Sequence, residues 1–202
     1  MKAVMLSIQP KWCELIASGK KTVEVRKTKP KIDVPFKCYI YCTKGDALAM
    51  PCLNVPQYTI HRMNNGTIKG RQMTEKEKEQ SDYSYANGKV IGEFICDEIH
   101  NFTKAFFDEQ TARDTDEISE LLGLTCLTYS ELCSYVGLKD FYGWHITDLV
   151  IYDKPKELIE FNSYNVMTYF DDELGLPMPT HIIKRPPQSY MFVEELKGAD
   201  NE

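Results

Sequence analysis

The segment GKKTVEVR, residues 19–26, decides how the fold of this chain is interpreted. Gly19 ends a short helical pattern, because glycine is the preferred residue just after a helix C-terminus. From position 22 the residues alternate strictly, as they do when side chains point to opposite faces of a strand. One face receives Val23 and Val25, and the other receives Thr22, Glu24 and Arg26. The segment therefore predicts a helix-to-strand turn with a row of polar groups on one face.

The flanking sequence extends this pattern on both sides. Residues 3–8 form an apolar run that is typical of a buried strand. Pro10 suits the first position of a helix, whose buried side would carry Trp12, Leu15 and Ile16. Residues 36–42 predict a second strand after the motif.

The rest of the chain predicts an α+β fold. Strands are expected at 89–99, 145–153 and 189–196, and a capping box at Thr128 and Glu131 opens a helix. The strands do not alternate with long helices, which disfavours a doubly wound α/β fold. The expected architecture is a small mixed β-barrel of about six strands with short helices packed at its ends.

Two stretches lack a sustained period and are expected to be inserted loop regions. They are residues 45–87, rich in Met, Asn, Gly, Lys and Glu, and residues 162–183. The domain organisation expected is thus a single domain over residues 1–202 with these two insertions.

Charge is distributed unevenly along the 202 residues, whose net charge is −6. Residues 1–40 hold nine Lys/Arg and three Asp/Glu, whereas residues 41–202 hold fifteen and twenty-seven. A basic region on an acidic chain fits a small or single-stranded anionic ligand better than long duplex DNA. The structural alternative is a solvated basic edge.

Seven cysteines without repeated spacing indicate buried thiols in a reducing compartment. Cys38 and Cys42 share a strand face, but no further ligands at zinc-site spacing accompany them. No apolar run approaches the ~20 residues of a membrane helix, and the first residues lack a signal-peptide pattern. The expectation is a cytoplasmic protein with no metal, no cofactor and no membrane partner.

The motif residues can do two kinds of chemistry. Lys21 and Arg26 can hold a phosphate or a base edge, with Arg26 bidentate and Lys21 as a point charge. Alternatively, Lys21 and Glu24 can transfer protons. The structural alternative is a half-exposed strand with ordinary pairing between Glu24 and its neighbouring cations.

The motif matches the pattern G-x-K-x-x-E-x-R in full, through Gly19, Lys21, Glu24 and Arg26. On these residues the chain resembles the ASCH (ASC-1 homology) domain family of the PUA-like superfamily. Further stretches resemble a bacterial and phage-encoded branch of that family: LSIQPKWCELIASGKKTVEVRKTKP, GKVIGEFICDEI, YGWHITDLVIYDKPKELIEF and RPPQSYMFVEEL. The resemblance implies a PUA-like β-barrel, a cleft lined by the motif, and RNA or a modified nucleoside as ligand.

Some members of the resembled family are hydrolases. Its small amidohydrolases remove the acetyl group from N4-acetylcytidine with a Lys and a Thr of this motif and a distant Glu. The Lys matches Lys21, but the position of the nucleophilic Thr is occupied by Glu24 here. Thr22 is on the same strand face, two residues before Glu24. A nucleoside amidohydrolase or a ribonuclease that uses Lys21 and Glu24 for proton transfer stays open, with Glu93 as a candidate second carboxylate.

The preferred function is binding of RNA or a modified nucleoside. The expected ligand-binding residues are Gly19, Lys20, Lys21, Thr22, Glu24, Arg26, Tyr142, Trp144, His145 and Arg185. Tyr142, Trp144 and His145 are either a base-stacking platform or a core aromatic cluster with a hydrogen-bonded histidine. Arg185 either contacts a phosphate or lies in a solvated loop. A third alternative is a protein-interaction module that docks an unknown partner through residues 45–87.

Overall fold

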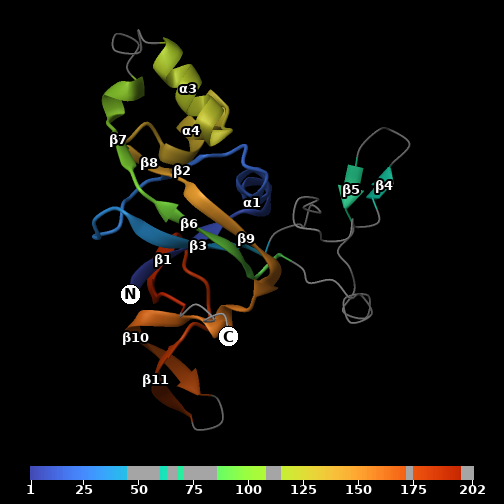
Figure 1. Ribbon diagram of the computed structural model, residues 1–202, viewed down its shortest axis with the longest axis vertical. Coiled ribbons are helices and arrows are strands. Elements are labelled where there is room, and N and C mark those ends of the chain that lie inside the picture. Colours follow the sequence, from blue (N-terminus) through green and yellow to red (C-terminus); the bar gives the residue numbers. More distant parts are fainter. Residues whose placement is uncertain (45–59, 63–67, 71–85, 108–114, 172–174, 197–202) are drawn as a thin grey trace. The chain divides into compact units, whose positions relative to one another are not determined.

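The computed structural model describes residues 1–44, 60–62, 68–70, 86–107, 115–171 and 175–196 (Figure 1). The chain divides into two compact units. The sheet unit comprises Met1–Glu14, Lys37–Glu93 and Val150–Glu202. The motif unit comprises Leu15–Phe36 and Phe94–Leu149.

Seven strands form the largest sheet, in the order β11-β10-β12-β1-β3-β6-β9. Their bounds are β1 Lys2–Ile8, β3 Phe36–Cys42, β6 Val90–Cys96, β9 Thr147–Lys156, β10 Asn162–Asp171, β11 Leu176–Ile182 and β12 Tyr190–Glu194. Strand β1 runs parallel to β3 and antiparallel to β12. The pairings among the described residues leave this sheet open between β11 and β9.

The core of the sheet unit gathers apolar side chains from several strands. Alternate residues of β1 and β3 enter it, as the strand period requires. The short helix η3, Leu158–Glu160, contributes Leu158. The buried members are Ala3, Met5, Tyr39, Tyr41, Val90, Leu158, Phe161, Ile183 and Val193.

The motif unit is built on a three-stranded sheet with two helices. Strand β8, Phe141–His145, lies between β2, Val23–Arg26, and β7, Ile99–Phe102. The helices are α3, Thr115–Thr125, and α4, Tyr129–Val136. Their apolar sides meet the sheet in a core of Val25, Leu121, Leu132, Val136 and Phe141.

Remaining elements are short. Helix α1, Pro10–Ala17, follows β1, and the 3₁₀ turn η2 spans Lys104–Phe107. Strands β4, Ile60–Arg62, and β5, Ile68–Gly70, pair antiparallel. In the described part of the chain, no helix is long and apolar enough to cross a membrane.

The α+β class is confirmed, as are the strands expected near 3–8, 36–42 and 189–196. The capping box is also confirmed: the Thr128 side chain accepts from the Glu131 amide, and the Glu131 carboxylate accepts from the Thr128 amide. Helix α4 ends at Gly137, whose φ of 68° lies in the left-handed region that favours glycine.

Strands are more numerous than the sequence predicted. Residues 141–145, expected as an aromatic loop, form β8, since aromatic side chains favour strands when a partner strand is present. Residues 162–182, expected within a loop insertion, form the antiparallel strands β10 and β11. Pro177 and Pro179 are compatible with β11, because it is an edge strand, where proline is tolerated.

The larger predicted insertion cannot be compared in full. Of residues 45–87, the structure describes 60–62, 68–70, 86 and 87, and the remainder lies outside the described residues. The single-domain organisation with two insertions stays a prediction.

Candidate functional site

The motif forms the expected turn from helix to strand. Gly19 adopts a φ of 72°, and its amide donates to the Ile16 carbonyl at 2.8 Å. The next two amides, of Lys20 and Lys21, both donate to the Leu15 carbonyl at 2.9 Å. The end of α1 is thus capped by the motif's own backbone, and β2 begins at Val23.

Strand β2 is buried on both faces. Val25 packs into the core of the motif unit. On the opposite face, Glu24 lies across from Trp144 and Arg26 lies across from Tyr142 in the pairing with β8. The half-exposed strand considered from the sequence is therefore not what the structure shows.

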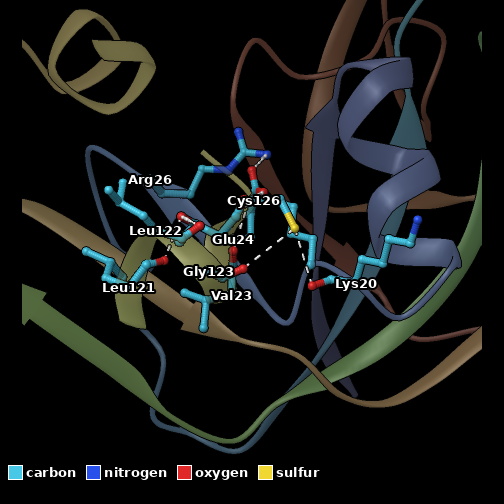
Figure 2. Close-up of polar contacts among 10 residues, drawn as sticks. Lys20, Val23, Glu24, Arg26, Leu121, Leu122, Gly123 and Cys126 are labelled. Carbon is cyan, nitrogen blue, oxygen red and sulfur yellow. Dashed lines mark hydrogen bonds and ion pairs between the residues drawn. The ribbon is translucent and has the colours of Figure 1, made fainter. Parts of the chain in front are cut away.

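Three charged side chains form a buried ion-pair cluster at the motif. Lys21, Glu24 and Arg26 are only 2%, 7% and 5% exposed. The Glu24 carboxylate lies between the two cations, with Oε2 3.3 Å from Lys21 Nζ and Oε1 3.1 Å from Arg26 Nη2. Figure 2 shows Glu24 and Arg26 pointing toward each other. The cluster holds two positive charges and one negative charge, and buried charge is costly unless it is paired.

The Lys21 ammonium is engaged on all sides by protein atoms. It donates to the Val23 carbonyl at 2.9 Å and to the Thr125 carbonyl at 2.8 Å, and it pairs with Glu24. An ammonium group has three N–H donors. Lys21 therefore uses its donors within the protein.

These contacts belong to a junction between the motif and the C-terminus of α3, here called the α3 junction. Besides the Lys21–Thr125 bond, the Thr22 amide donates to the Leu124 carbonyl at 3.0 Å. Cys126 Sγ lies 3.3 Å from the Lys20 carbonyl (Figure 2). A cation is favourable at this helix end, where carbonyl groups lack partners within the helix. The motif lysine thus helps to fix α3 against β2.

Tyr135 of α4 reaches the same cluster. Its hydroxyl is hydrogen-bonded to Arg26. Burial raises the pKa of the Tyr135 phenol above its usual value. The positive charge of Arg26 lowers this pKa, and the negative charge of Glu24 raises it further. Sequence reasoning missed Tyr135, because the capping box locates α4 but does not say which strand its last turn meets.

Basic and aromatic side chains alternate beside Arg26. Lys27 Nζ lies 5.0 Å from the ring centre of Tyr135, and Lys29 Nζ lies 5.8 Å from that of Tyr142. Both lysines are exposed. These are cation–π distances, and they place two ammonium groups over two rings that adjoin Arg26.

The remaining predicted residues of the motif unit lie in different settings. Trp144 is fully buried, with its ring edge-on to that of Phe36 at a centre-to-centre distance of 5.8 Å, which is the setting of a core aromatic residue. The Thr22 hydroxyl is buried and has no hydrogen-bond partner among the described residues. Lys20 is exposed, and Figure 2 shows its side chain directed away from Glu24 and Arg26.

His145 forms a pair with Asp97 instead of joining the cluster. Its Nδ1 lies 2.7 Å from Asp97 Oδ1, and both side chains are partly exposed. It lies across from Val23 in the β2–β8 pairing, on the face opposite to Glu24. The hydrogen bond with His145 lowers the pKa of Asp97.

Two predicted residues belong to the sheet unit. Arg185 is exposed, after β11. Glu93 is half-buried, and both of its carboxylate oxygens have partners. Its Oε1 lies 2.8 Å from Lys37 Nζ, and its Oε2 accepts a hydrogen bond from the Tyr152 hydroxyl at 2.5 Å. Within the described ranges, no three His, Cys, Asp or Glu side chains are grouped so as to hold a metal ion.

Comparison with known proteins gives a family and a set of solved structures. Residues 6–105 match the family model of the ASCH domain, and this range contains the whole motif. The crystal structure of ASCH from Zymomonas mobilis is 15% identical, with 96% of this chain and 88% of that chain covered and a TM-score of 0.48. A serine-to-alanine variant of that protein gives 14% identity, 96% and 89% coverage and the same TM-score. No curated protein matches the chain.

The matched residues 6–105 include all four residues of the motif, Gly19, Lys21, Glu24 and Arg26. The more specific bacterial and phage-encoded branch stays a prediction. Residues 6–105 carry an ASCH domain, and the chain belongs to the ASCH domain family.

Proposed function

We propose that the surface beside Arg26 binds RNA or a modified nucleoside. ASCH domains have a PUA-like fold that is generally linked to RNA binding. The observation that carries the proposal for this chain is the arrangement around Arg26, where Tyr135 and Tyr142 each lie beneath an exposed lysine.

Each part of this arrangement matches a part of a nucleotide. A guanidinium can bind a phosphate or a base edge through two parallel hydrogen bonds. Tyrosine rings stack on bases of any type, and stacking contributes about 1–3 kcal/mol per base. The ammonium groups of Lys27 and Lys29 attract the phosphate backbone. The excess positive charge of the buried cluster also favours an anionic ligand.

Lys21 and Glu24 act in this proposal as positioning residues. Glu24 orients the Arg26 guanidinium by ion pairing, and Lys21 orients Glu24 and fixes α3. Lys20, Thr22, Trp144 and His145 are not assigned a ligand contact. Arg185 belongs to the sheet unit and is not assigned a ligand contact either.

A hydrolase that uses Lys21 as a base receives less support. A general base needs a lone pair on nitrogen, and an ammonium that donates to two carbonyls and a carboxylate has none to offer. Glu24, the other residue of that alternative, is held on both carboxylate oxygens, by Lys21 and by Arg26, so its oxygens are engaged within the protein.

The test is a combined binding and turnover measurement on the full chain. Plain and modified ribonucleosides, N4-acetylcytidine included, and short single-stranded RNA are titrated against the protein, and each mixture is analysed by chromatography. Replacing both exposed lysines, Lys27→Gln with Lys29→Gln, should weaken RNA binding without affecting folding. Arg26→Gln should weaken binding to every ligand by about tenfold or more, the scale of a charge-assisted hydrogen bond.

The matched control is Lys139→Gln, which removes an exposed lysine from the same unit. It should bind as the wild type does. Absence of binding by the wild type to every RNA and nucleoside tested would refute the proposal. Product formation would instead establish the hydrolase.

A further inference from the structure

Three side chains form one row across the three-stranded sheet of the motif unit. In the pairing of β2 with β8, Arg26 lies across from Tyr142, and in the pairing of β7 with β8, Asn101 lies across from the same tyrosine. Residues directly opposite each other on neighbouring strands share a face of the sheet, with Cβ atoms about 4.5–5.5 Å apart. The order across this face is therefore guanidinium, phenol ring and carboxamide, and the three residues are called the Arg26–Asn101 row below.

Asn101 is the open end of this row. It lies in β7, which is an edge strand of the sheet, and it is exposed. Tyr142, in the middle, is partly buried, and Arg26, at the other end, is buried. Lys29 Nζ lies 5.8 Å from the ring centre of Tyr142. The row thus runs from a cationic end at Arg26 and Lys29, across a ring, to an amide that a ligand can reach.

The surroundings of the row are basic. Five Lys/Arg and two Asp/Glu occur in the segments that carry the row, residues 24–31, 99–104 and 140–145. Both acidic side chains have protein partners. Glu24 pairs with Arg26, and the Asp140 carboxylate accepts a hydrogen bond from the Lys104 amide at 2.7 Å. The charge around the row is therefore compatible with the phosphate of a nucleotide.

We propose that Asn101 reads the base of the bound nucleotide and selects adenine. The inference rests on the proposed function and deepens it, because it names the base that the same site prefers. The phosphate faces Arg26 and Lys29, the base stacks on Tyr142, and the edge of the base faces Asn101. This order follows the order of the row, and a single strand leaves the base edges unpaired.

The chemistry of the carboxamide gives the choice of base. An asparagine side chain sets an acceptor oxygen beside a donor NH₂ group. Adenine presents the complement, an N6 donor beside the N7 acceptor, and asparagine pairs with it through two hydrogen bonds. On the corresponding edge, guanine presents two acceptors and uracil presents its O4 acceptor, so neither satisfies both groups of the amide.

The test compares the affinity of the full chain for fluorescein-labelled oligoadenylate and oligouridylate of one length, by anisotropy. The wild type should prefer oligoadenylate. A purine also stacks well, so the readout is the ratio of the two affinities in each variant. Asn101→Ala should lower this ratio by about fivefold or more, the smallest discrimination expected of a two-bond contact.

Two further variants separate base reading from charge and from folding. Asn101→Asp keeps the size of the side chain but replaces its donor with an acceptor, and it should lower the same ratio. Its added charge repels both strands alike and cancels in the ratio. Asn165→Ala, which removes an exposed asparagine from β10, is the matched control and should leave the ratio unchanged. Circular dichroism checks that each variant is folded.

The outcomes distinguish this inference from the proposed function. An unchanged ratio in Asn101→Ala, with binding that Arg26→Gln still weakens, would overturn the inference and leave the proposed function in place. Wild-type protein that binds oligouridylate as tightly as oligoadenylate would do the same. Absence of wild-type binding to both strands would overturn the inference, and absence of binding to every other RNA and nucleoside as well would refute the proposed function.

Discussion

The buried side chain of Lys21 holds the site together, because it links β2, α3 and Glu24. It is buried, it bonds to two carbonyls on different elements, and it neutralises Glu24. Removing one partner from a buried ion pair leaves the other charge uncompensated. Stability and ligand binding are therefore linked at this residue, although its donors contact only protein.

Lys21→Met should lower the free energy of unfolding by about 3 kcal/mol or more, because Glu24 and the Thr125 carbonyl lose a buried partner. Urea denaturation followed by circular dichroism measures this loss. The neighbouring exposed lysine supplies the control, since Lys20→Met should change stability by less than about 0.5 kcal/mol. A stable Lys21→Met protein that has lost RNA binding would identify Lys21 as a ligand contact instead.

The Asp97–His145 pair predicts a small dependence of stability on acid pH. The pKa of Asp97 is lowered from 3.8 in the folded state, so its contribution is present above that value and is lost as the pH falls below it. The effect is small, since both side chains are partly exposed. Urea denaturation between pH 5 and pH 3 should show a shallower loss for Asp97→Asn than for the wild type. Parallel curves would show that the pair contributes nothing.

The sequence of helix α4 predicts where the helix starts and ends, but not which residue of the site it contacts. Its start and end are local, because the capping box and Gly137 act within one turn, and both were predictable. The contact of Tyr135 with Arg26 is not local, since it depends on how α4 packs against β2. Motif turns and caps can thus be predicted from neighbouring residues, whereas the members of the site cannot.

Thr128→Ala should lower the free energy of unfolding by about 1 kcal/mol, because the Glu131 amide loses its acceptor. Ser130→Ala, an exposed position in the first turn of the same helix, is the control and should be nearly neutral. Thermal unfolding of both variants measures the difference. Equal melting temperatures would mean that the cap is replaced by water at no cost.

Strand β6 gives a second prediction at the scale of an element. A Cβ atom at Gly92 would lie 2.4 Å from the Val150 carbonyl oxygen of the neighbouring strand. Gly92→Ala must therefore displace backbone, and it should destabilise the protein by about 1–3 kcal/mol. Chemical denaturation checks this, with Gly123→Ala as control, since a Cβ there meets no atom within 4 Å. An unchanged midpoint for Gly92→Ala would show that β9 can move away.

At the scale of the whole molecule, charge decides which nucleic acids can bind. The net charge of −6 opposes long duplexes, while the basic patch at Lys27 and Lys29 favours short single strands. Binding to single-stranded RNA should weaken as salt rises. The slope should fall by about 0.7 for each phosphate contact removed with Lys27→Gln or Lys29→Gln. Titrations at several salt concentrations test this, and salt-resistant binding of random duplex DNA would contradict it.

The sequence predicted the α+β class, the motif turn and the ASCH family, since each follows from local patterns. Burial of Lys21 and Arg26 was not predictable, because it is imposed by α3, α4 and β8, about a hundred positions away. Strands β10 and β11 were missed because residues 162–183 show no sustained period, and both strands are stabilised by pairing with each other and with β12.

The α3 junction also bears on the order in which the chain folds. The Lys21–Thr125 hydrogen bond joins residues 104 positions apart. Closing so long a loop costs entropy before the contact returns any energy. The turn at Gly19 and the caps of α4 need no such closure, so we expect them to form early and the junction to form late. Pulse-labelled hydrogen exchange at the Thr22 amide, whose acceptor is the Leu124 carbonyl, would time that step. RNA binding through Arg26 would then become available only once this last contact is made.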